Sequence, residues 1–349
     1  MKKYIQAAII GCGGIAQTHL TALLGIDYVQ IVAVCDIVRE RAEEMAEKIV
    51  ISYQENRENH EVTIFENWHD LLQNKEIESV HLCTPHYLHA EMAIGAMKSG
   101  KHVLTEKPMA ISLADANHMN QTSKETGMRL GVCFQNRFNQ TSRRMRELID
   151  DGKIGELLGG RAFVTWNRGA GYYASGSWRG TWSEEGGGVL INQSIHTMDL
   201  LQWFLGKPTS VKGTYDTRLL KESIEVEDVA EAIISFSDEA HGLFYATNNY
   251  CTDSSVFLEI MGSDAVMRLN DDLIIQYKNG TVEHVTEADE KTGGKAYWGS
   301  GHVALIKNWY QCIEKGEPFF IDGEAGISAL KIVLGIYESQ RTGQEISLT

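Results

Sequence analysis

A glycine-rich segment near the start of the chain has the spacing of a dinucleotide-binding turn. Its sequence is Gly11-Cys12-Gly13-Gly14-Ile15-Ala16, the pattern G-x-G-x-x-A, and it follows an apolar run that predicts a strand at residues 5–10. The first glycine permits a tight turn, the second lets the backbone approach a pyrophosphate, and the small third residue allows close packing of helix on strand. The helix expected at residues 15–24 would offer unpaired N–H groups to the phosphates. We therefore expect Gly11, Gly13, Gly14 and Ile15 to bind a dinucleotide.

A carboxylate stands where the ribose of such a dinucleotide would lie. Asp36 follows the second predicted strand, residues 30–35, twenty-five positions after Gly11. It could bind both ribose hydroxyls of NAD and would repel the 2′-phosphate of NADP, although Arg39 and Arg41 follow closely and would weaken that preference. A glycine-rich turn without a ligand is the alternative, but strand, turn, helix and acid stand in the expected order. The expected cofactor is NAD rather than NADP.

A second set of polar residues lies on an otherwise apolar helix. Residues 189–204 predict a helix on which Asn192, His196 and Asp199 share one face, since they are four and three positions apart. Apolar side chains, among them Leu190 and Met198, occupy much of the remaining surface. This pattern predicts a buried polar site. A core histidine whose hydrogen bonds are satisfied by Asp199 is the alternative.

The elements that must position these residues differ between the two parts of the chain. The first third alternates strands with helices, and the strands are expected at residues 5–10, 30–35, 80–83, 102–105 and 129–134. Such units predict a parallel sheet with helices on both faces. Beyond residue 150 most strands follow one another directly, which predicts a mostly antiparallel sheet. The helix at residues 189–204 interrupts these strands, and a final amphipathic helix is expected at residues 324–340. We expect an α/β protein with a nucleotide-binding domain over residues 1–136 and a second domain over residues 137–349.

Bulk composition limits the classes of function. The chain has 349 residues, enough for two domains, and a net charge of −15, which argues against a nucleic-acid partner. There is no run of about 18 apolar residues that could span a membrane, and the apolar stretch at residues 7–10 is too short for a signal peptide. Six cysteines without a C-x-x-C pair indicate buried thiols rather than disulfides or a zinc site. We expect a cytoplasmic protein without a metal.

Further motifs run along nearly the whole chain. They are, in order, Thr84-Pro85 with Leu88-His89, Gly100-Lys101-His102-Val103, Glu106-Lys107-Pro108, Gly186-Gly187-Gly188 before His196 and Asp199, and Tyr337-Glu338-Ser339 with Gly343. Together with the glycine-rich turn, this set resembles the glucose–fructose oxidoreductase / inositol dehydrogenase / rhizopine-catabolism (Gfo/Idh/MocA) family. The resemblance implies an N-terminal Rossmann domain plus a C-terminal α/β domain with an open, mostly antiparallel sheet. It also implies pairing through that sheet as a homodimer or homotetramer.

The same resemblance implies an NAD-dependent dehydrogenase that oxidises a ring secondary alcohol of a sugar, cyclitol or sugar derivative. Lys107 and His196 would be its catalytic residues, and Thr84, Pro85, His86, Glu106 and Lys107 would complete the cofactor site. Hydride transfer from an alcohol needs a group that takes the hydroxyl proton. Proline favours an extended conformation in the residue before it, which would direct Lys107 toward the cofactor. To act as a base near neutrality a lysine needs desolvation or a cationic neighbour such as NAD⁺; a surface lysine is the alternative.

Position 192 departs from the usual pattern of the family. Many members carry aspartate where this chain has Asn192. Because an amide cannot accept a proton at neutral pH, Asn192 would position the substrate, and the proton would go to His196 or Lys107. The string from Asn192 to His196 resembles the sugar 3-dehydrogenase branch of the family, which implies oxidation at a ring C3.

Other substrate-binding candidates follow predicted strands. Gln135, Asn136 and Arg137 follow the strand that ends at Phe134, and a second stretch contains Asn167, Arg168, Tyr172, Tyr173 and Arg179. Aromatic faces stack on sugar C–H surfaces, and arginine suits a carboxylate or phosphate. The residues from which we expect substrate contacts are Gln135, Asn136, Asn167, Tyr172, Arg179, Asn192 and His196. For the residues of the two stretches named above, a structural role is an equally good interpretation. Residues 299–302 are a further loop candidate, or the first turn of a helix.

Two alternative functions share this fold. A redox-type glycosidase would keep its NAD bound and recycle it, and would form product without added NAD. A non-catalytic NAD-sensing regulator would bind NAD without turnover of polyols. The presence of Glu106-Lys107-Pro108 together with His196 argues against the regulator.

Overall fold

A computed structural model describes residues 4–54, 60–287 and 301–349, which form two compact units. The first unit contains residues 4–135 and 301–326, and the second contains residues 136–287 and 327–349. The sequence analysis predicted a single boundary after residue 136. It did not predict that residues 301–326 belong to the first unit. Within the described ranges, no helix is long and apolar enough to cross a membrane.

The first unit is built on a six-stranded sheet with the order β3-β2-β1-β4-β5-β6. Every neighbouring pair in this sheet is parallel. This is the strand order of a doubly wound, dinucleotide-binding sheet. Its strands are β1 (Ile5–Ile10), β2 (Val29–Cys35), β3 (Thr63–Phe65), β4 (Ser79–Leu82), β5 (His102–Thr105) and β6 (Leu130–Val132). All four residues of β4 are buried, as expected for a sheet covered on both faces.

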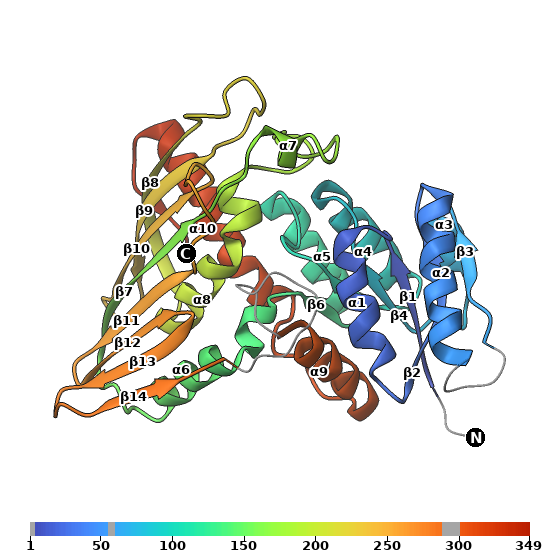
Figure 1. The fold of residues 1–349 in the computed structure, drawn as a ribbon, viewed down its shortest axis with the longest axis horizontal. Coiled ribbons are helices and arrows are strands. Elements are labelled where there is room, and N and C mark those ends of the chain that lie inside the picture. Colours follow the sequence, from blue (N-terminus) through green and yellow to red (C-terminus); the bar gives the residue numbers. More distant parts are fainter. Residues whose placement is uncertain (1–3, 55–59, 288–300) are drawn as a thin grey trace. The chain divides into compact units, whose positions relative to one another are not determined.

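Six α-helices accompany this sheet among the described residues (Figure 1). They are α1 (Gly14–Leu24), α2 (Arg39–Gln54), α3 (Trp68–Gln73), α4 (His89–Lys98), α5 (Leu113–Thr126) and α9 (Gly301–Lys315). α5 begins where the Ser112 hydroxyl accepts the Asp115 N–H, and it ends at Gly127, whose φ of 70° suits glycine. α9 packs against α1. The sequence patterns did not predict β3 or α3, and of α9 they gave only a first turn, as the alternative interpretation of residues 299–302.

The second unit contains a nine-stranded sheet with the order β14-β13-β12-β11-β7-β10-β9-β8-β15. Only the β10–β7 pair within it is parallel, so the prediction of a mostly antiparallel sheet is confirmed. The strands are β7 (Leu157–Thr165), β8 (Pro208–Asp216), β9 (Val229–Phe236), β10 (His241–Thr247), β11 (Phe257–Gly262), β12 (Ala265–Asn270), β13 (Asp272–Tyr277), β14 (Val282–Val285) and β15 (Ile346–Ser347).

Helices cover one face of this sheet. α8 (Ile195–Leu205) packs on β7, β10 and β11, and α6 (Gln140–Asp150) packs on α8 (Figure 1). α7 (Ala170–Tyr173) is short, and α10 (Gly323–Thr342) matches the final helix predicted from the sequence. Buried and exposed residues alternate along β10, as expected for a sheet with one covered face.

The helix predicted at residues 189–204 is not continuous. A π-helical turn, Val189–Gln193, precedes α8, and the Ser194 N–H donates to the carbonyl of Val189 at 2.8 Å. Single π turns are frequent at functional sites because they redirect side chains from the regular helical spacing. Asn192 lies in this turn and His196 in α8. The uniform helical face expected for Asn192 and His196 is therefore wrong in detail.

Candidate functional site

The glycine-rich turn has the geometry needed for a dinucleotide. Gly11 has a φ of 89°, and a Cβ there would lie 2.6 Å from the carbonyl oxygen of Cys83. A Cβ at Gly13 or Gly14 would meet nothing within 4 Å, so the backbone there is open to a ligand. α1 begins at Gly14, and no side chain caps it. Its first N–H groups can therefore bind a pyrophosphate, and the residues present fit NAD.

Asp36 is anchored beside this turn. Its two carboxylate oxygens accept hydrogen bonds from the N–H groups of Cys12 and Val38, each at 2.8 Å. Each oxygen keeps a second lone pair for a ribose hydroxyl. Arg39 donates to Glu43 and Glu66, each at 2.8 Å, so its charge is already neutralised. Arg39 is therefore poorly suited to hold the 2′-phosphate of NADP.

We expect Asp36→Ala to raise the Kd of NADH at least about tenfold, since a charged partner of two hydroxyls is lost. The Kd of NADPH should change less, because the same substitution removes a charge that repels the 2′-phosphate. Asp36→Asn, which keeps an acceptor for the backbone, serves as the matched control for the fold. Titration of protein fluorescence with each cofactor measures both constants. Equal losses of affinity for the two cofactors would contradict the ribose assignment.

Two loops at the carboxyl edge of the sheet are joined by one histidine. The Thr84-Pro85 segment follows β4, and His86 opens a buried 3₁₀ turn, His86–Leu88. The ring nitrogens of His89 lie 2.9 Å from the carbonyl oxygen of Thr84 and 2.8 Å from that of Pro108. This ring therefore links the Thr84 loop to the segment that carries Lys107.

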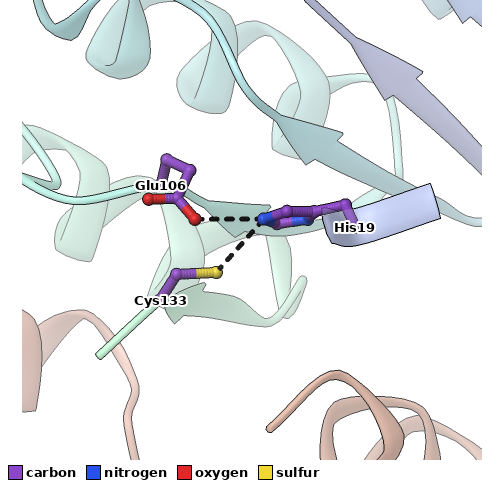
Figure 2. Close-up of side chains that lie close together, drawn as sticks. All are labelled: His19, Glu106 and Cys133. Carbon is purple, nitrogen blue, oxygen red and sulfur yellow. Dashed lines mark hydrogen bonds and ion pairs between the residues drawn. The ribbon is translucent and has the colours of Figure 1, made fainter. Parts of the chain in front are cut away.

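Glu106 belongs to a buried chain of hydrogen bonds in the first unit (Figure 2). His19 Nε2 lies 3.0 Å from Glu106 Oε1, and His19 Nδ1 lies 2.7 Å from His81 Nδ1. His81 Nε2 lies in turn 2.8 Å from the hydroxyl of Tyr310, on α9. All these hydrogen bonds can form when both histidines are neutral and Glu106 is ionised. Tyr310 then donates to His81, His81 donates to His19, and His19 donates to Glu106.

The charges around Glu106 keep its carboxyl ionised. Burial acts to raise its pKa, but the hydrogen bond and charge of His19, with the charges of His302 and Lys107, hold the pKa well below its usual range. Burial lowers the pKa of His302 to about 4. His302 lies in the first turn of α9, while residues 299 and 300 of the same candidate loop lie outside the described residues.

Cys133 completes a cluster with the spacing of a metal site. The donor atoms of His19, Glu106 and Cys133 all lie within 4.8 Å of one another, and Figure 2 shows the thiol directed toward the imidazole. The Cys133 sulfur is 3.9 Å from His19 Nε2. Burial, together with the charge of Glu106, raises the pKa of this thiol well above its ordinary value, so it remains protonated. Because a metal needs the thiolate and Glu106 is already paired, we interpret the cluster as a hydrogen-bond network.

Lys107 is half-buried next to Glu106. Its N–H donates to Glu106 Oε2 at 3.3 Å, and the Lys107–Pro108 peptide bond is cis. The charge of Lys107 contributes to lowering the pKa of Glu106, His89 and His302. Lys107 follows the end of β5 by two residues, so it lies at the carboxyl edge of the sheet, where ligands of such sheets bind.

In the second unit, the structure reveals a buried carboxylate that the sequence patterns missed. Glu185 is fully buried; it accepts hydrogen bonds from the N–H of Gly180 and from the amide nitrogen of Asn192. The Asn192 amide also donates to the Tyr172 hydroxyl at 3.3 Å. Glu185 directly precedes the glycine motif, but no spacing rule relates an acid there to Asn192.

Glu227 holds the start of the π turn and was also missed. Its carboxylate accepts the N–H of Gly188 at 2.8 Å, that of Leu190 at 2.9 Å and the Tyr337 hydroxyl at 2.9 Å. Burial raises the pKa of Glu227 to about 7, although these hydrogen bonds oppose the shift. A Cβ at Gly188 would lie 1.9 Å from the Glu227 carbonyl oxygen, and one at Gly187 would lie 2.0 Å from the Tyr337 hydroxyl. The glycine motif and Tyr337 thus pack around Glu227, which holds the start of the π turn that contains Asn192.

Asp199 is not the hydrogen-bond partner of His196 that the alternative interpretation required. Both of its oxygens accept hydrogen bonds from Arg137, at 2.8 and 2.6 Å, and Gln202 donates to one of them at 3.1 Å. The guanidinium of Arg137 also lies over the Trp203 ring, 5.3 Å from its centroid. The Nε and Nη2 groups of Arg137 are therefore held by a buried carboxylate, which gives this arginine a structural role, and its expected contact with substrate stays a prediction. His196 is buried one turn earlier on the same helix.

The remaining substrate candidates divide into two groups. Tyr172 and Arg179 are in contact: the guanidinium lies 4.5 Å from the Tyr172 ring centroid and donates to its hydroxyl, close to Asn192. Asn167 instead donates to the Tyr250 carbonyl at 2.7 Å, which ties it to another loop. Gln135 ends the first unit and Asn136 begins the second, both buried in the short 3₁₀ helix Gln135–Phe138.

Comparison with known proteins gives the family of the chain. Residues 5–134 match the model of the NAD-binding Rossmann fold of the Gfo/Idh/MocA oxidoreductase family, and residues 146–348 match its C-terminal α/β domain. The chain belongs to this family. The predicted fold class and the prediction of NAD as the cofactor are confirmed for this Gfo/Idh/MocA oxidoreductase.

Relatives match this oxidoreductase over its full length. Myo-inositol 2-dehydrogenase of Thermotoga maritima is 22% identical, with 99% of this chain and 98% of the relative covered. scyllo-Inositol 2-dehydrogenase (NAD(+)) of Bacillus subtilis is 24% identical, with 100% and 97% covered. The crystal structure of the WlbA dehydrogenase from Bordetella pertussis, in complex with NADH and UDP-GlcNAcA, is 27% identical with a TM-score of 0.84 and 99% of each chain covered.

Proposed function

We propose that Lys107 and His196 are the catalytic residues with which this NAD-dependent dehydrogenase oxidises a ring secondary alcohol of a sugar, cyclitol or sugar derivative. The family and its relatives, which include dehydrogenases of cyclitols, support NAD-dependent oxidation of CH–OH groups. The observation that carries the assignment of Lys107 is its place two residues after the end of β5, at the edge of the sheet where ligands bind.

The proposed roles follow from the chemistry of each side chain. NAD, when bound, supplies the acceptor for the hydride that leaves the alcohol carbon. Lys107, in its neutral form, takes the proton of the reacting hydroxyl on its Nζ. His196 hydrogen-bonds to the same oxygen and orients it. The proposal requires both side chains to reach one alcohol group.

We propose further that the ring carbon oxidised is C3. It is supported by the string from Asn192 to His196 and by the similarity to a dehydrogenase crystallised with UDP-GlcNAcA. The contact between Tyr172 and Arg179 adds an aromatic face and a cation, a combination suited to a sugar that carries a carboxylate or phosphate.

The experiment that tests the function is a screen for NADH formation over inositols, hexoses, glycosides and UDP-sugars. Identification of the ketone product by mass spectrometry and NMR then gives the oxidised carbon. Oxidation of at least one ring polyol is expected. Bound NAD without turnover of any member would overturn the proposal in favour of a regulatory protein. Product formation without added NAD would favour a glycosidase that recycles its cofactor.

We also propose that the second unit pairs with another copy through the uncovered face of its sheet. Ile233 on β9 and Leu243 on β10 are neighbours in register and are 58% and 46% exposed. Leu158, Ile274 and Val282 are also exposed on strands of this sheet. Exposed apolar side chains that gather on one sheet are typical of protein interfaces. Light scattering of the purified protein is expected to give the mass of a dimer or tetramer, and a monomer mass would contradict this.

A further inference from the structure

Three successive N–H groups at the start of the π turn all donate to one residue, Glu227. The N–H of Gly188 donates to Glu227 Oε2 at 2.8 Å, and that of Leu190 donates to Oε1 at 2.9 Å. The N–H of Val189, which lies between them, donates to the backbone carbonyl of Glu227 at 3.1 Å. Glu227 is fully buried and lies two residues before β9, so the sheet fixes its backbone. The turn is therefore anchored to the sheet through this one residue.

One further hydrogen bond connects this anchor to Asn192. The carbonyl of Gly188 accepts the N–H of Asn192 at 3.0 Å. Gly188 thus has its N–H on the carboxylate of Glu227 and its carbonyl on the residue that we expect to bind substrate. Because a single residue joins the two, we expect a shift of Gly188 to move Asn192 with it.

The carboxyl of Glu227 changes its charge near neutral pH. Its partners are the two N–H groups and the hydroxyl of Tyr337, which donates to Oε1 at 2.9 Å. These three donors favour the ionised form, whereas burial disfavours it, and the balance raises the pKa of Glu227 to about 7. Both the ionised and the protonated form are therefore populated at pH 7.

A proton on this carboxyl finds only one acceptor among its three partners. The backbone N–H groups of Gly188 and Leu190 are donors and cannot accept it. The Tyr337 hydroxyl can turn and accept the proton, but Oε1 then loses a donor. Hydrogen bonds to a neutral carboxyl are also weaker than those to a carboxylate. Protonation therefore weakens the hold of Glu227 on the π turn.

Three tyrosines and a second carboxyl share this buried region. The tyrosines whose pKa the charge of Glu227 raises are Tyr337 on α10, Tyr215 on β8 and Tyr173 on α7. A raised pKa keeps these phenols neutral at pH 7, so they do not titrate together with Glu227. Glu185 also acts on two of them, and the variants below separate its effect from that of Glu227.

We propose that Glu227 is a positioning residue whose carboxylate fixes the π turn that carries Asn192, so that protonation of this carboxylate weakens binding of the polyol substrate. The inference rests on the proposed function in one respect, namely that the ligand contacted by Asn192 is a polyol. It adds a dependence of substrate affinity on pH that arises outside Lys107 and His196.

The first test follows KM for the best polyol of the screen as pH changes. From pH 8 to pH 6 we expect KM of the wild type to rise about fivefold, since most Glu227 carboxyls become protonated over this range. In Glu227→Gln, which has no carboxylate to present, KM should be high at pH 8 and constant down to pH 6. kcat should keep the same pH dependence in both proteins, because it reports on proton transfer to Lys107. The same pH dependence of KM in both proteins would overturn the proposal.

Two further variants make this test specific. Tyr337→Phe keeps the carboxylate and removes one hydrogen bond to its ionised form, so the pH midpoint of KM should move upward by about one unit. Asp228→Asn is the matched control for lost stability. Asp228 is equally buried, but its carboxylate accepts the N–H groups of residues 218–220 rather than those of the π turn. It should lower the Tm and leave the pH dependence of KM unchanged. An unshifted midpoint in Tyr337→Phe would leave Glu227 a structural residue and overturn the proposal.

Thermal stability should change with pH in the opposite direction to substrate affinity. The pKa of Glu227 is raised in the folded state above its ordinary value near 4, so the stability from this group is complete below pH 4 and is lost as pH rises through about 7. Between pH 5 and pH 8 the Tm of the wild type should fall by about 5 °C more than that of Glu227→Gln. Equal changes of Tm in the two proteins would contradict a titration of Glu227 in this range.

A spectroscopic measurement needs no substrate and keeps the two proposals distinguishable. In protein labelled with ¹⁵N-asparagine, the backbone amide signal that disappears in Asn192→Asp belongs to Asn192. This signal should shift with a midpoint near pH 7 in the wild type and should be independent of pH in Glu227→Gln. A signal that does not shift in the wild type would overturn the role of Glu227. A shifting signal together with failure of every polyol to react would overturn the proposed function instead.

Discussion

Replacing Lys107 with methionine is expected to lower kcat/KM for NADH formation at least about a thousandfold, since general-base catalysis contributes 10²–10⁴. The Kd of NAD should change less than about threefold, because the glycine-rich turn and Asp36 supply the contacts expected for the phosphates and ribose. Methionine matches the length of the lysine stem and removes only the amine. Steady-state kinetics with the best polyol and a fluorescence titration with NADH measure the two quantities.

Lys98→Met is the matched control for this variant. Lys98 is exposed at the end of α4, so its replacement should leave both constants unchanged. Normal turnover by the Lys107 variant would remove its proposed role. Loss of NAD binding in the same variant would assign Lys107 to the cofactor rather than to proton transfer.

Asp199→Asn is expected to produce the largest loss of stability. The variant removes the charge that pairs with Arg137, whose side chain is only 4% exposed. Breaking a buried ion pair by removing one partner leaves an uncompensated buried charge and costs about 3–5 kcal/mol. Denaturant unfolding of the variant, followed by circular dichroism, measures the change in the free energy of unfolding.

A surface pair in the same unit provides the comparison. Arg146 and Asp150 on α6 form an i,i+4 ion pair in which Asp150 is 62% exposed. Asp150→Asn should cost less than about 1 kcal/mol, because solvent screens such a pair. Equal losses for Asp199→Asn and Asp150→Asn would show that the Arg137 pair carries no special weight. Replacement of both Arg137 and Asp199 by apolar residues should recover part of the loss.

Most of the fold of the first unit could be predicted from local sequence patterns. The G-x-G-x-x-A turn, Asp36 and the alternation of strands with helices predict a doubly wound sheet, because each depends on residues close together in sequence. The short elements β3 and α3 were missed, since three to six residues hold too little periodicity to separate them from loops. The interruption of the helix after Gln193 was missed for a related reason. A π turn adds one residue to a helical turn, and the spacing of apolar residues does not predict that addition.

The sequence by itself determined the fold class, the family and the cofactor, because short motifs of fixed spacing encode them. Only the tertiary structure decided which buried polar groups face one another: Glu106 with His19 and His81, Glu185 with Asn192, and Asp199 with Arg137 rather than with His196. Except for Glu185 and Asn192, these partners lie tens of residues apart. A buried charge is stable only when a partner meets it in space, and packing of the whole unit selects that partner.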